Sequence, residues 1–237
     1  MPQKPRKGAA SLPDPSWRGL YLAGSLCALL FVVLVVVPLV LLAAAPPVPA
    51  QGTAVLEYIG AHKAVYLAQL ICFVGLAAPA LVVFLALATA LKQVDKNLAA
   101  IGALVGISSE VVALALGSSP QSLHGGLVLL ADRYVAAGAL ERVTLASAAD
   151  ALVAATNAVS WAGILTAAGI LLLSVVMTRG LFHRAVAYIG IVTGALGIVS
   201  ETLRPLIGPA YILYGLLLPA WFVMVGVKLF SLRTQAP

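Results

Sequence analysis

Long apolar runs separated by short polar or basic segments make up most of this chain of 237 residues. The runs are continuous rather than alternating, and each is close to or above the roughly 20 residues that a helix needs to cross a bilayer. Backbone polar groups in hydrocarbon must be paired within a helix or a closed barrel, and barrel strands alternate. The pattern therefore predicts an all-α integral membrane bundle of six transmembrane helices. The predicted helices cover residues 17–45, 64–91, 98–116, 151–178, 185–203 and 210–230.

The segments outside these runs are proline-rich, charged or amphipathic. Residues 1–16 are basic and rich in proline, so we expect a disordered cytoplasmic tail ahead of a single transmembrane domain, 17–233. Residues 45–63 are broken by prolines, and we expect an exposed connection with one turn of interfacial helix. We expect 118–150 to form an outer loop with an amphipathic segment at the interface. Pro79, inside the second helix, predicts a kink at or before its position.

The first apolar run also has the order of features of a cleaved signal peptide. A basic start and an apolar core precede Val48-Pro49-Ala50, after which cleavage would leave Gln51 as the first residue. The core is much longer than the roughly 7 to 15 apolar residues that signal peptides use. A retained first helix is therefore favoured, and cleavage stays open.

Composition agrees with lipid as the main solvent of the chain. Hydrophobic residues make up 62% of the sequence, charged residues 9%, and the mean hydropathy is +1.08, whereas soluble domains carry about a quarter charged residues. The net charge of +6 would suggest a nucleic-acid partner in a soluble protein, but here the basic residues sit at the ends of apolar runs. We therefore expect the lipid bilayer as partner and no nucleic acid. Cys27 and Cys72 fall inside apolar runs, which indicates small buried hydrophobes rather than a disulfide or metal site.

The distribution of basic residues tests the six-helix topology. With a cytoplasmic N-terminus, most of the basic residues fall inside and few fall outside, as the positive-inside rule requires. Both termini are therefore predicted to be cytoplasmic. The inside set is Lys4, Arg6, Lys7, Arg18, Lys92, Lys96, Arg179, Arg184, Lys228 and Arg233; the outside set is Lys63, Arg133, Arg142 and Arg204.

Three short motifs resemble a known family. Residues 91–99 (LKQVDKNLA) form a charged turn, 179–182 (RGLF) form a basic turn, and 218–220 (LPA) lie in the last helix, with Gly226 and Lys228 at its exit. Together they resemble the bacterial six-helix membrane proteins grouped as domain of unknown function 4386, over roughly residues 20 to 230. The resemblance implies the six-helix fold and a bacterial cytoplasmic (inner) membrane location, and it implies no activity.

The sequence departs from that family at one position. The family often has an arginine three residues before the polar or acidic position of its third helix, and here that place is Ile107. A charge pair within the helix is therefore absent.

Two carboxylates inside apolar runs are the main candidates for function. A charge at the bilayer centre costs at least about 2.5 to 3.5 kcal/mol on insertion scales. At about 1.5 Å per residue, Glu110 lies about 21 Å along its helix from Lys96, and Glu201 about 25 Å from Arg184. Both fall in the outer half of the membrane. Their surroundings, GALVGISSE and GALGIVSE, are similar, which suggests a parallel repeat of helices two and three in helices four and five.

Further polar residues lie at a similar depth. Asp150, Asn157 and Ser160-Trp161 share one face of the fourth helix. Together with Glu110, Glu201 and Arg204, Asp150 and Asn157 are predicted to line a polar cavity open to the outside. The alternative is structural: Arg204 pairs with Glu201, Asp150 caps the fourth helix, and Glu110 is protonated or bonded to a serine.

No motif supports an enzyme, a cofactor or a metal site. No serine has a histidine near it in any helix, no phosphate-binding glycine loop is present, and His62 with His124 lacks a third ligand of diagnostic spacing. Glycines in GxxxG spacing are instead predicted to let helices approach closely. These helix-packing glycines are Gly102, Gly106, Gly190 and Gly194.

Two hypotheses about function follow. The first is a non-enzymatic membrane protein that packs with itself or with other membrane subunits through the glycine faces. The second is a small transporter or proton-coupled carrier that uses Glu110 and Glu201.

Overall fold

The computed structural model describes residues 14–41, 43–116, 125–159, 161–207 and 210–235, and these residues contain helices and no strand. The all-α fold class is therefore confirmed. The elements are η1 (Pro15–Trp17), α1 (Arg18–Leu41), α2 (Gly52–Gly75), α3 (Ala77–Leu91), α4 (Lys96–Leu116), α5 (Gly126–Ala136), α6 (Ala139–Val159), α7 (Ala162–Met177), α8 (Arg184–Thr202), α9 (Arg204–Ile207) and α10 (Tyr211–Gln235).

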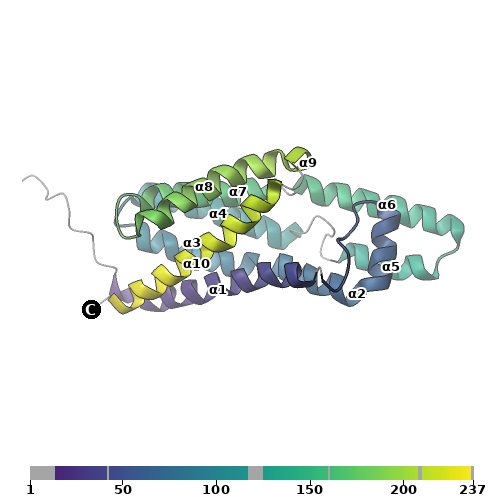
Figure 1. Ribbon diagram of the computed structural model, residues 1–237, viewed down its shortest axis with the longest axis horizontal. Coiled ribbons are helices and arrows are strands. Elements are labelled where there is room, and N and C mark those ends of the chain that lie inside the picture. The colour runs from purple at the N-terminus through teal and green to yellow at the C-terminus, as the bar shows by residue number, and fades with distance from the viewer. Residues whose placement is uncertain (1–13, 42, 117–124, 160, 208–209, 236–237) are drawn as a thin grey trace, which may run out of the picture.

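A long bundle and a helical extension at one of its ends form the molecule (Figure 1). The bundle consists of α1, α3, α4, α7, α8 and α10, with α7 packed between α4 and α8 and α1 packed between α3 and α10. Its core is apolar and aromatic: Trp221, Phe84 and Phe222 have no exposed surface. Phe31 stacks on Phe222 with 3.8 Å between ring centroids. Since Phe31 belongs to α1, the first helix contributes directly to this core.

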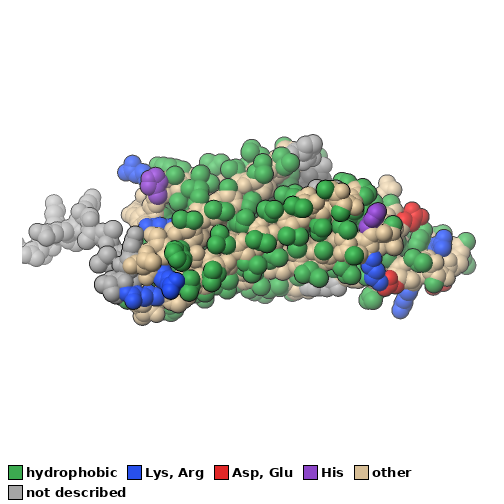
Figure 2. Space-filling model, turned by 60° about the horizontal axis from the view of Figure 1, so that its bottom comes forward, with side chains coloured by type: hydrophobic (Ala, Val, Ile, Leu, Met, Phe, Trp, Pro, Cys, Tyr) green, Lys and Arg blue, Asp and Glu red, His purple; other side chains and the backbone are tan. Residues whose placement is uncertain are grey.

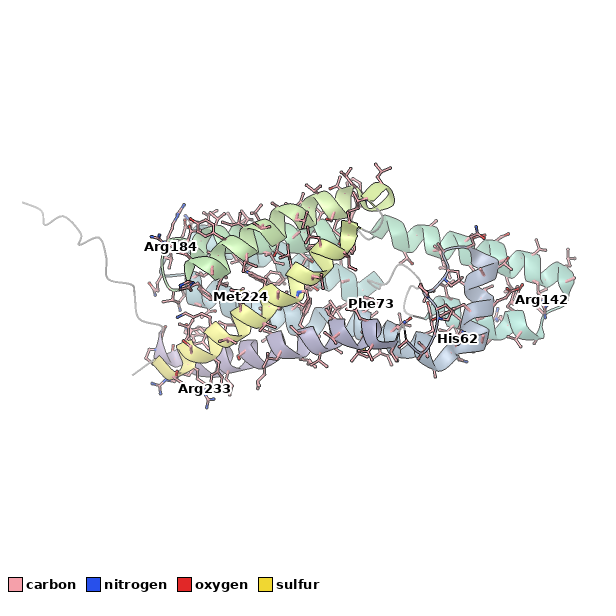
Figure 3. All side chains as sticks on the ribbon, viewed as in Figure 1. His62, Phe73, Arg142, Arg184, Met224 and Arg233 are labelled. Atoms are coloured by element: carbon pink, nitrogen blue, oxygen red, sulfur yellow. The ribbon has the colours of Figure 1, made fainter. Side chains whose placement is uncertain are left out.

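The extension is formed by the first half of α2, by α5 and by α6, and it has a core of its own. Leu56, Ile59 and Leu127 are fully buried there. At His62 the backbone of α2 leaves the helical region (φ −128°, ψ 36°), and the first half of the helix turns across the bundle axis (Figure 1). His62 is labelled at this bend in Figure 3.

Two segments predicted to be loops with a short helical or amphipathic part contain longer helices in the structure. The predicted connection at 45–63 becomes helix from Gly52 onwards, and the predicted outer loop at 118–150 contains α5 and the first half of α6. The charged residues in both segments interrupt the apolar runs, which hid the i, i+3, i+4 spacing of buried residues such as Val55, Leu56 and Ile59. Residues 117–124 lie outside the described part of the chain.

Two predicted helices are divided. The predicted helix 64–91 corresponds to the second half of α2 and to α3, which meet at Leu76, ahead of Pro79. Pro79 has no amide hydrogen to donate, which is consistent with a restart of the helix at this point. The predicted helix 151–178 corresponds to the end of α6 and to α7, with α6 ending at Val159 and α7 beginning at Ala162.

Five helices of the described chain are long and apolar enough to cross a membrane, and α7 is a shorter apolar helix. Figure 2 shows an apolar surface along the middle of the molecule, with charged side chains gathered towards its two ends. The chain is therefore an integral membrane protein of the helical type. The long spans are Pro15–Leu41, Gly52–Leu91, Lys96–Ala115, Arg184–Thr202 and Tyr211–Thr234, and the shorter helix is Ala162–Met177.

The end of the bundle opposite the extension is called the basic end here. Figure 3 labels Arg184 and Arg233 at this end. The helix ends that meet there add Arg18, Lys92, Lys96 and Arg179. Asp95, in the turn between α3 and α4, accepts a hydrogen bond from the amide of Leu98 at 3.1 Å and pairs with Arg179 at 2.9 Å. Arg179 lies in the turn between α7 and α8. The two turns of the basic end are therefore linked by an ion pair.

Candidate functional site

Glu110 is held by hydroxyl groups between α4 and α7. The residue is 3% exposed, and its Oε1 atom accepts a hydrogen bond from the Thr166 hydroxyl at 2.9 Å. The Thr166 oxygen lies 2.6 Å from the hydroxyl oxygen of Ser109. Ser109, in turn, donates to the backbone carbonyl of Ala162. These groups form one hydrogen-bonded chain from the carboxylate to the first turn of α7.

Glu201 approaches the same turn of α7 from the other neighbouring helix. It lies near the end of α8, is 6% exposed, and accepts a hydrogen bond from the Tyr211 hydroxyl at 2.6 Å. A Cβ atom placed on Gly163 would lie 2.8 Å from the Glu201 carboxylate carbon. Glycine at position 163 therefore provides the space that the carboxylate occupies.

Both buried carboxylates are thus connected to the first turn of α7. Glu110 is joined to this turn through Ser109 and Ala162, and Glu201 packs on Gly163. The first amides of a helix have no partner within the helix, and the helix dipole is positive there, so this position favours nearby negative charge. Trp161 precedes the turn and is 64% exposed.

The other members of the predicted polar cavity are not part of this group. Asp150 is exposed and accepts a hydrogen bond from the amide of Gly52 at 2.5 Å, so it caps the beginning of α2 in the extension. Asp150 lies inside α6 rather than at the beginning of a helix, so it does not cap the fourth helix as the structural alternative predicted. The side chains of Asn157 and Arg204 lie outside the described part of the structure.

Three residues of the site were missed by the sequence analysis. Thr166 is one of two hydroxyl residues, with Ser174, in the apolar run of α7, which is a usable signal, because a hydroxyl within a membrane helix needs a partner. Tyr211 begins the last helix, and nothing in its spacing indicates Glu201. Gly163 gives no signal, because its role depends on which helix lies opposite. In the structural alternative, Glu110 was protonated or bonded to a serine; in the structure its carboxylate accepts a hydrogen bond from the Thr166 hydroxyl.

The glycines in GxxxG spacing face other helices of the same chain. A Cβ atom on Gly102 would lie 3.0 Å from Leu173, one on Gly106 would lie 2.6 Å from Phe84, and one on Gly194 would lie 2.7 Å from the Ala167 carbonyl. Gly190 packs against Trp221 of α10 and against α7. The glycine faces are therefore occupied within the bundle, and they do not support contact with another subunit.

The predicted parallel repeat is not visible in the packing. A two-fold axis that relates α3–α4 to α7–α8 would superpose α3 on α7 and α4 on α8. The contact between α4 and α7 would then be repeated between α8 and α3. Instead, α8 packs mainly on α7 and α10. The helices that carry Glu110 and Glu201, α4 and α8, both pack on α7.

No family model, no curated protein and no solved structure matches the chain. The resemblance to domain of unknown function 4386 stays a prediction. In the described part of the chain, no three His, Cys, Asp or Glu side chains are grouped as a metal site would require. His124 lies outside the described residues.

Proposed function

We propose that the chain crosses a bacterial cytoplasmic membrane six times, with both termini on the cytoplasmic side. The five long apolar helices and α7 supply the spans, the last with the end of α6. Trp17 and Trp161 are 40% and 64% exposed and lie towards opposite ends of the apolar surface, where tryptophans favour the membrane interfaces. The basic end then faces the cytoplasm, the extension faces outwards, and α1 is retained because it is part of the core.

We further propose that the protein is a small proton-coupled carrier whose proton-binding group is Glu110, with Glu201 beside it. One observation carries the proposal. The chain from Glu110 through Thr166 and Ser109 to the Ala162 carbonyl has three contacts between oxygen atoms, each within hydrogen-bonding distance. Each contact needs one hydrogen, and the two hydroxyl groups supply only two.

A proton on Glu110 completes the chain. The protonated carboxyl donates to Thr166, Thr166 donates to Ser109, and Ser109 donates to the carbonyl of Ala162. In the ionised form, Thr166 donates to Glu110, and Ser109 has one hydrogen for two acceptors. The arrangement therefore has two hydrogen-bonding states that differ by one proton, which is the property a proton-coupled carrier needs at its coupling site.

Proton flux in reconstituted vesicles tests this function. An imposed pH gradient across vesicles that contain the wild-type chain and a potassium ionophore should dissipate faster than in empty vesicles, as read by an internal pH-sensitive dye. Glu110→Gln should abolish the protein-dependent flux, and Glu201→Gln should reduce it. Glu141→Gln is the matched control, because Glu141 is exposed in the first turn of α6. Protein-dependent flux that is unchanged in Glu110→Gln would contradict the proposal.

Association with itself or with other membrane proteins is the second candidate function. The glycine faces no longer support it, but the tip of the extension does: Leu140 is 86% exposed, and Val143 and Leu129 are 65% and 69% exposed. Exposed apolar patches often mark interaction sites. Light scattering on the purified chain tests self-association, which Leu140→Gln combined with Val143→Gln should weaken. A monomer that these substitutions do not alter would exclude self-association through the tip.

A further inference from the structure

A cavity of about 400 Å³ lies between the beginning of α8 and the end of α10, away from the carboxylate site. The two helices pack closely at Gly190 and Trp221 and then diverge towards the basic end (Figure 1). The divergence leaves a groove. Figure 3 labels Met224, which lines the groove, and Arg184, which follows the lining residue His183 in the chain. The groove is lined by His183, Val186, Val223, Met224, Val227, Lys228 and Ser231.

The lining of the groove has an apolar part and a polar part. Val186, Val223 and Val227 supply apolar walls, and Val227 is 63% exposed on the surface of the bundle. His183, Lys228 and Ser231 supply the polar groups, each one turn or less nearer to the basic end along its own helix. The lining thus changes from apolar to polar in the direction in which a membrane changes from hydrocarbon to headgroups.

The charge of the polar part is positive. Lys228 is a half-buried cation in the wall, and the described residues that line the groove include no carboxylate. His183 uses Nδ1 to accept the amide of Ala185 at 3.2 Å, so its hydrogen is carried by Nε2, which remains a donor. Arg184 follows directly in the chain and is exposed. An occupant of the polar part must therefore be an anion or a hydrogen-bond acceptor.

We propose that this groove binds one anionic phospholipid from the surrounding leaflet. Lys228 and His183 hold the headgroup phosphate, and one acyl chain lies along Val186, Val223 and Val227. A lipid fits because the apolar wall continues onto the exposed bundle surface at Val227, and because basic pockets between membrane helices on the cytoplasmic side recognise anionic headgroups. This inference rests on the proposed orientation, with the basic end at the cytoplasmic side, and it is independent of the proton-carrier proposal, since the two sites share no residue.

Lipid titration of the purified full-length chain in detergent tests the proposal. Native mass spectrometry would compare binding of phosphatidylglycerol with binding of phosphatidylcholine of the same acyl chains. Phosphatidylglycerol should bind more tightly, and Lys228→Gln should weaken it about fivefold, as expected for one basic residue near a lipid headgroup. Lys228→Arg should keep the preference. Val227→Trp, which fills the mouth of the groove, should weaken both lipids.

Arg233→Gln is the matched control, because Arg233 is an exposed cation of α10 that does not line the groove. It should leave the lipid preference unchanged. Equal loss in Lys228→Gln and Arg233→Gln would mean general attraction to the basic end and would overturn the proposal. Equal binding of the two lipids, or unchanged binding in Val227→Trp, would overturn it as well. If Lys228→Gln does not elute as a folded protein, Lys228→Arg is compared with His183→Asn, which keeps an acceptor for the Ala185 amide. Weaker phosphatidylglycerol binding in His183→Asn than in Lys228→Arg would support the proposal, and equal binding would overturn it.

Discussion

The hydroxyl oxygens of Ser109 and Thr166 lie 2.6 Å apart between α4 and α7. This contact links the Glu110 carboxylate to the backbone of the first turn of α7. Because a hydrogen is needed at every contact along the chain, the protonation state of Glu110 determines whether the Thr166 hydroxyl donates to Glu110 or to Ser109. The helix packing and the proposed proton chemistry therefore depend on the same few atoms.

Thr166→Val should destabilise the protein more than its loss of one hydroxyl suggests. The valine leaves the buried Glu110 without its hydroxyl partner, and an unsatisfied buried polar group costs about 1 to 3 kcal/mol. The melting temperature in detergent should fall, and Thr166→Ser should retain most of the wild-type value. Thr202→Val is the control, because the Thr202 hydroxyl is exposed and bonds only the Ile198 carbonyl of its own helix. Equal effects of the two valine substitutions would argue against the hydroxyl chain.

Gly163→Ala should disturb the carboxylate site, whereas Gly215→Ala should be tolerated. A Cβ atom at 163 would lie 2.8 Å from the Glu201 carboxylate carbon, while a Cβ atom at 215 meets nothing within 4 Å. Alanine at 215 should raise stability by about 0.5 to 1 kcal/mol, because glycine is unfavourable inside a helix. Thermal unfolding compares the two variants directly. Unchanged stability in Gly163→Ala would mean that Glu201 does not occupy this space.

Asp95→Ala should cost more stability than Arg179→Gln. The ion pair between the exposed Arg179 and the half-buried Asp95 contributes about 0.2 to 1 kcal/mol. Asp95 also accepts the amide of Leu98 at the beginning of α4, and loss of such a cap costs about 1 kcal/mol. Asp95→Asn keeps the cap and should resemble Arg179→Gln. Denaturation at low and high salt separates the two contributions, because only the ion pair is screened. An equal loss of unfolding free energy in Asp95→Ala and Asp95→Asn would contradict a capping role for Asp95.

Ser174→Ala should stabilise the bundle. The Ser174 hydroxyl and the Trp221 indole nitrogen are buried against Gly190, and neither has a protein hydrogen-bond partner in the described part of the chain. Replacing an unpaired buried hydroxyl with a methyl group removes a cost of about 1 to 3 kcal/mol. The melting temperature should therefore rise. A fall would show that the hydroxyl has a partner such as a bound water molecule.

The all-α class and the existence of the apolar helices could be predicted from the sequence, because hydropathy alone indicates membrane helices. The extension was predicted only as one turn of helix and an amphipathic segment, because charged residues such as Glu57 and Lys63 interrupt its apolar pattern. There, helices are stabilised by a small core away from the main bundle, around Leu56 and Leu127.

The candidate site was predicted in part. Glu110 and Glu201 stood out because an ionisable group in an apolar run requires a compensating environment. The partners Thr166, Gly163 and Tyr211 depend on which helices pack together, and the sequence does not contain that information in any local pattern. Asp150 was grouped with the site because of its depth along one helix. In the structure, α2 bends at His62, and its first residue, Gly52, donates its amide hydrogen to Asp150.

Infrared difference spectroscopy of the carboxyl C=O band tests the central claim, that Glu110 exchanges a proton, most directly. The purified chain in lipid would be stepped between acidic and alkaline buffer while the protonated carboxyl band is recorded. The wild type should lose a band on the alkaline step. This band should be absent in Glu110→Gln, shifted in Thr166→Val and unchanged in Glu141→Gln. Identical difference spectra of the wild type and Glu110→Gln would contradict the account, because Glu110 would then be a fixed structural group.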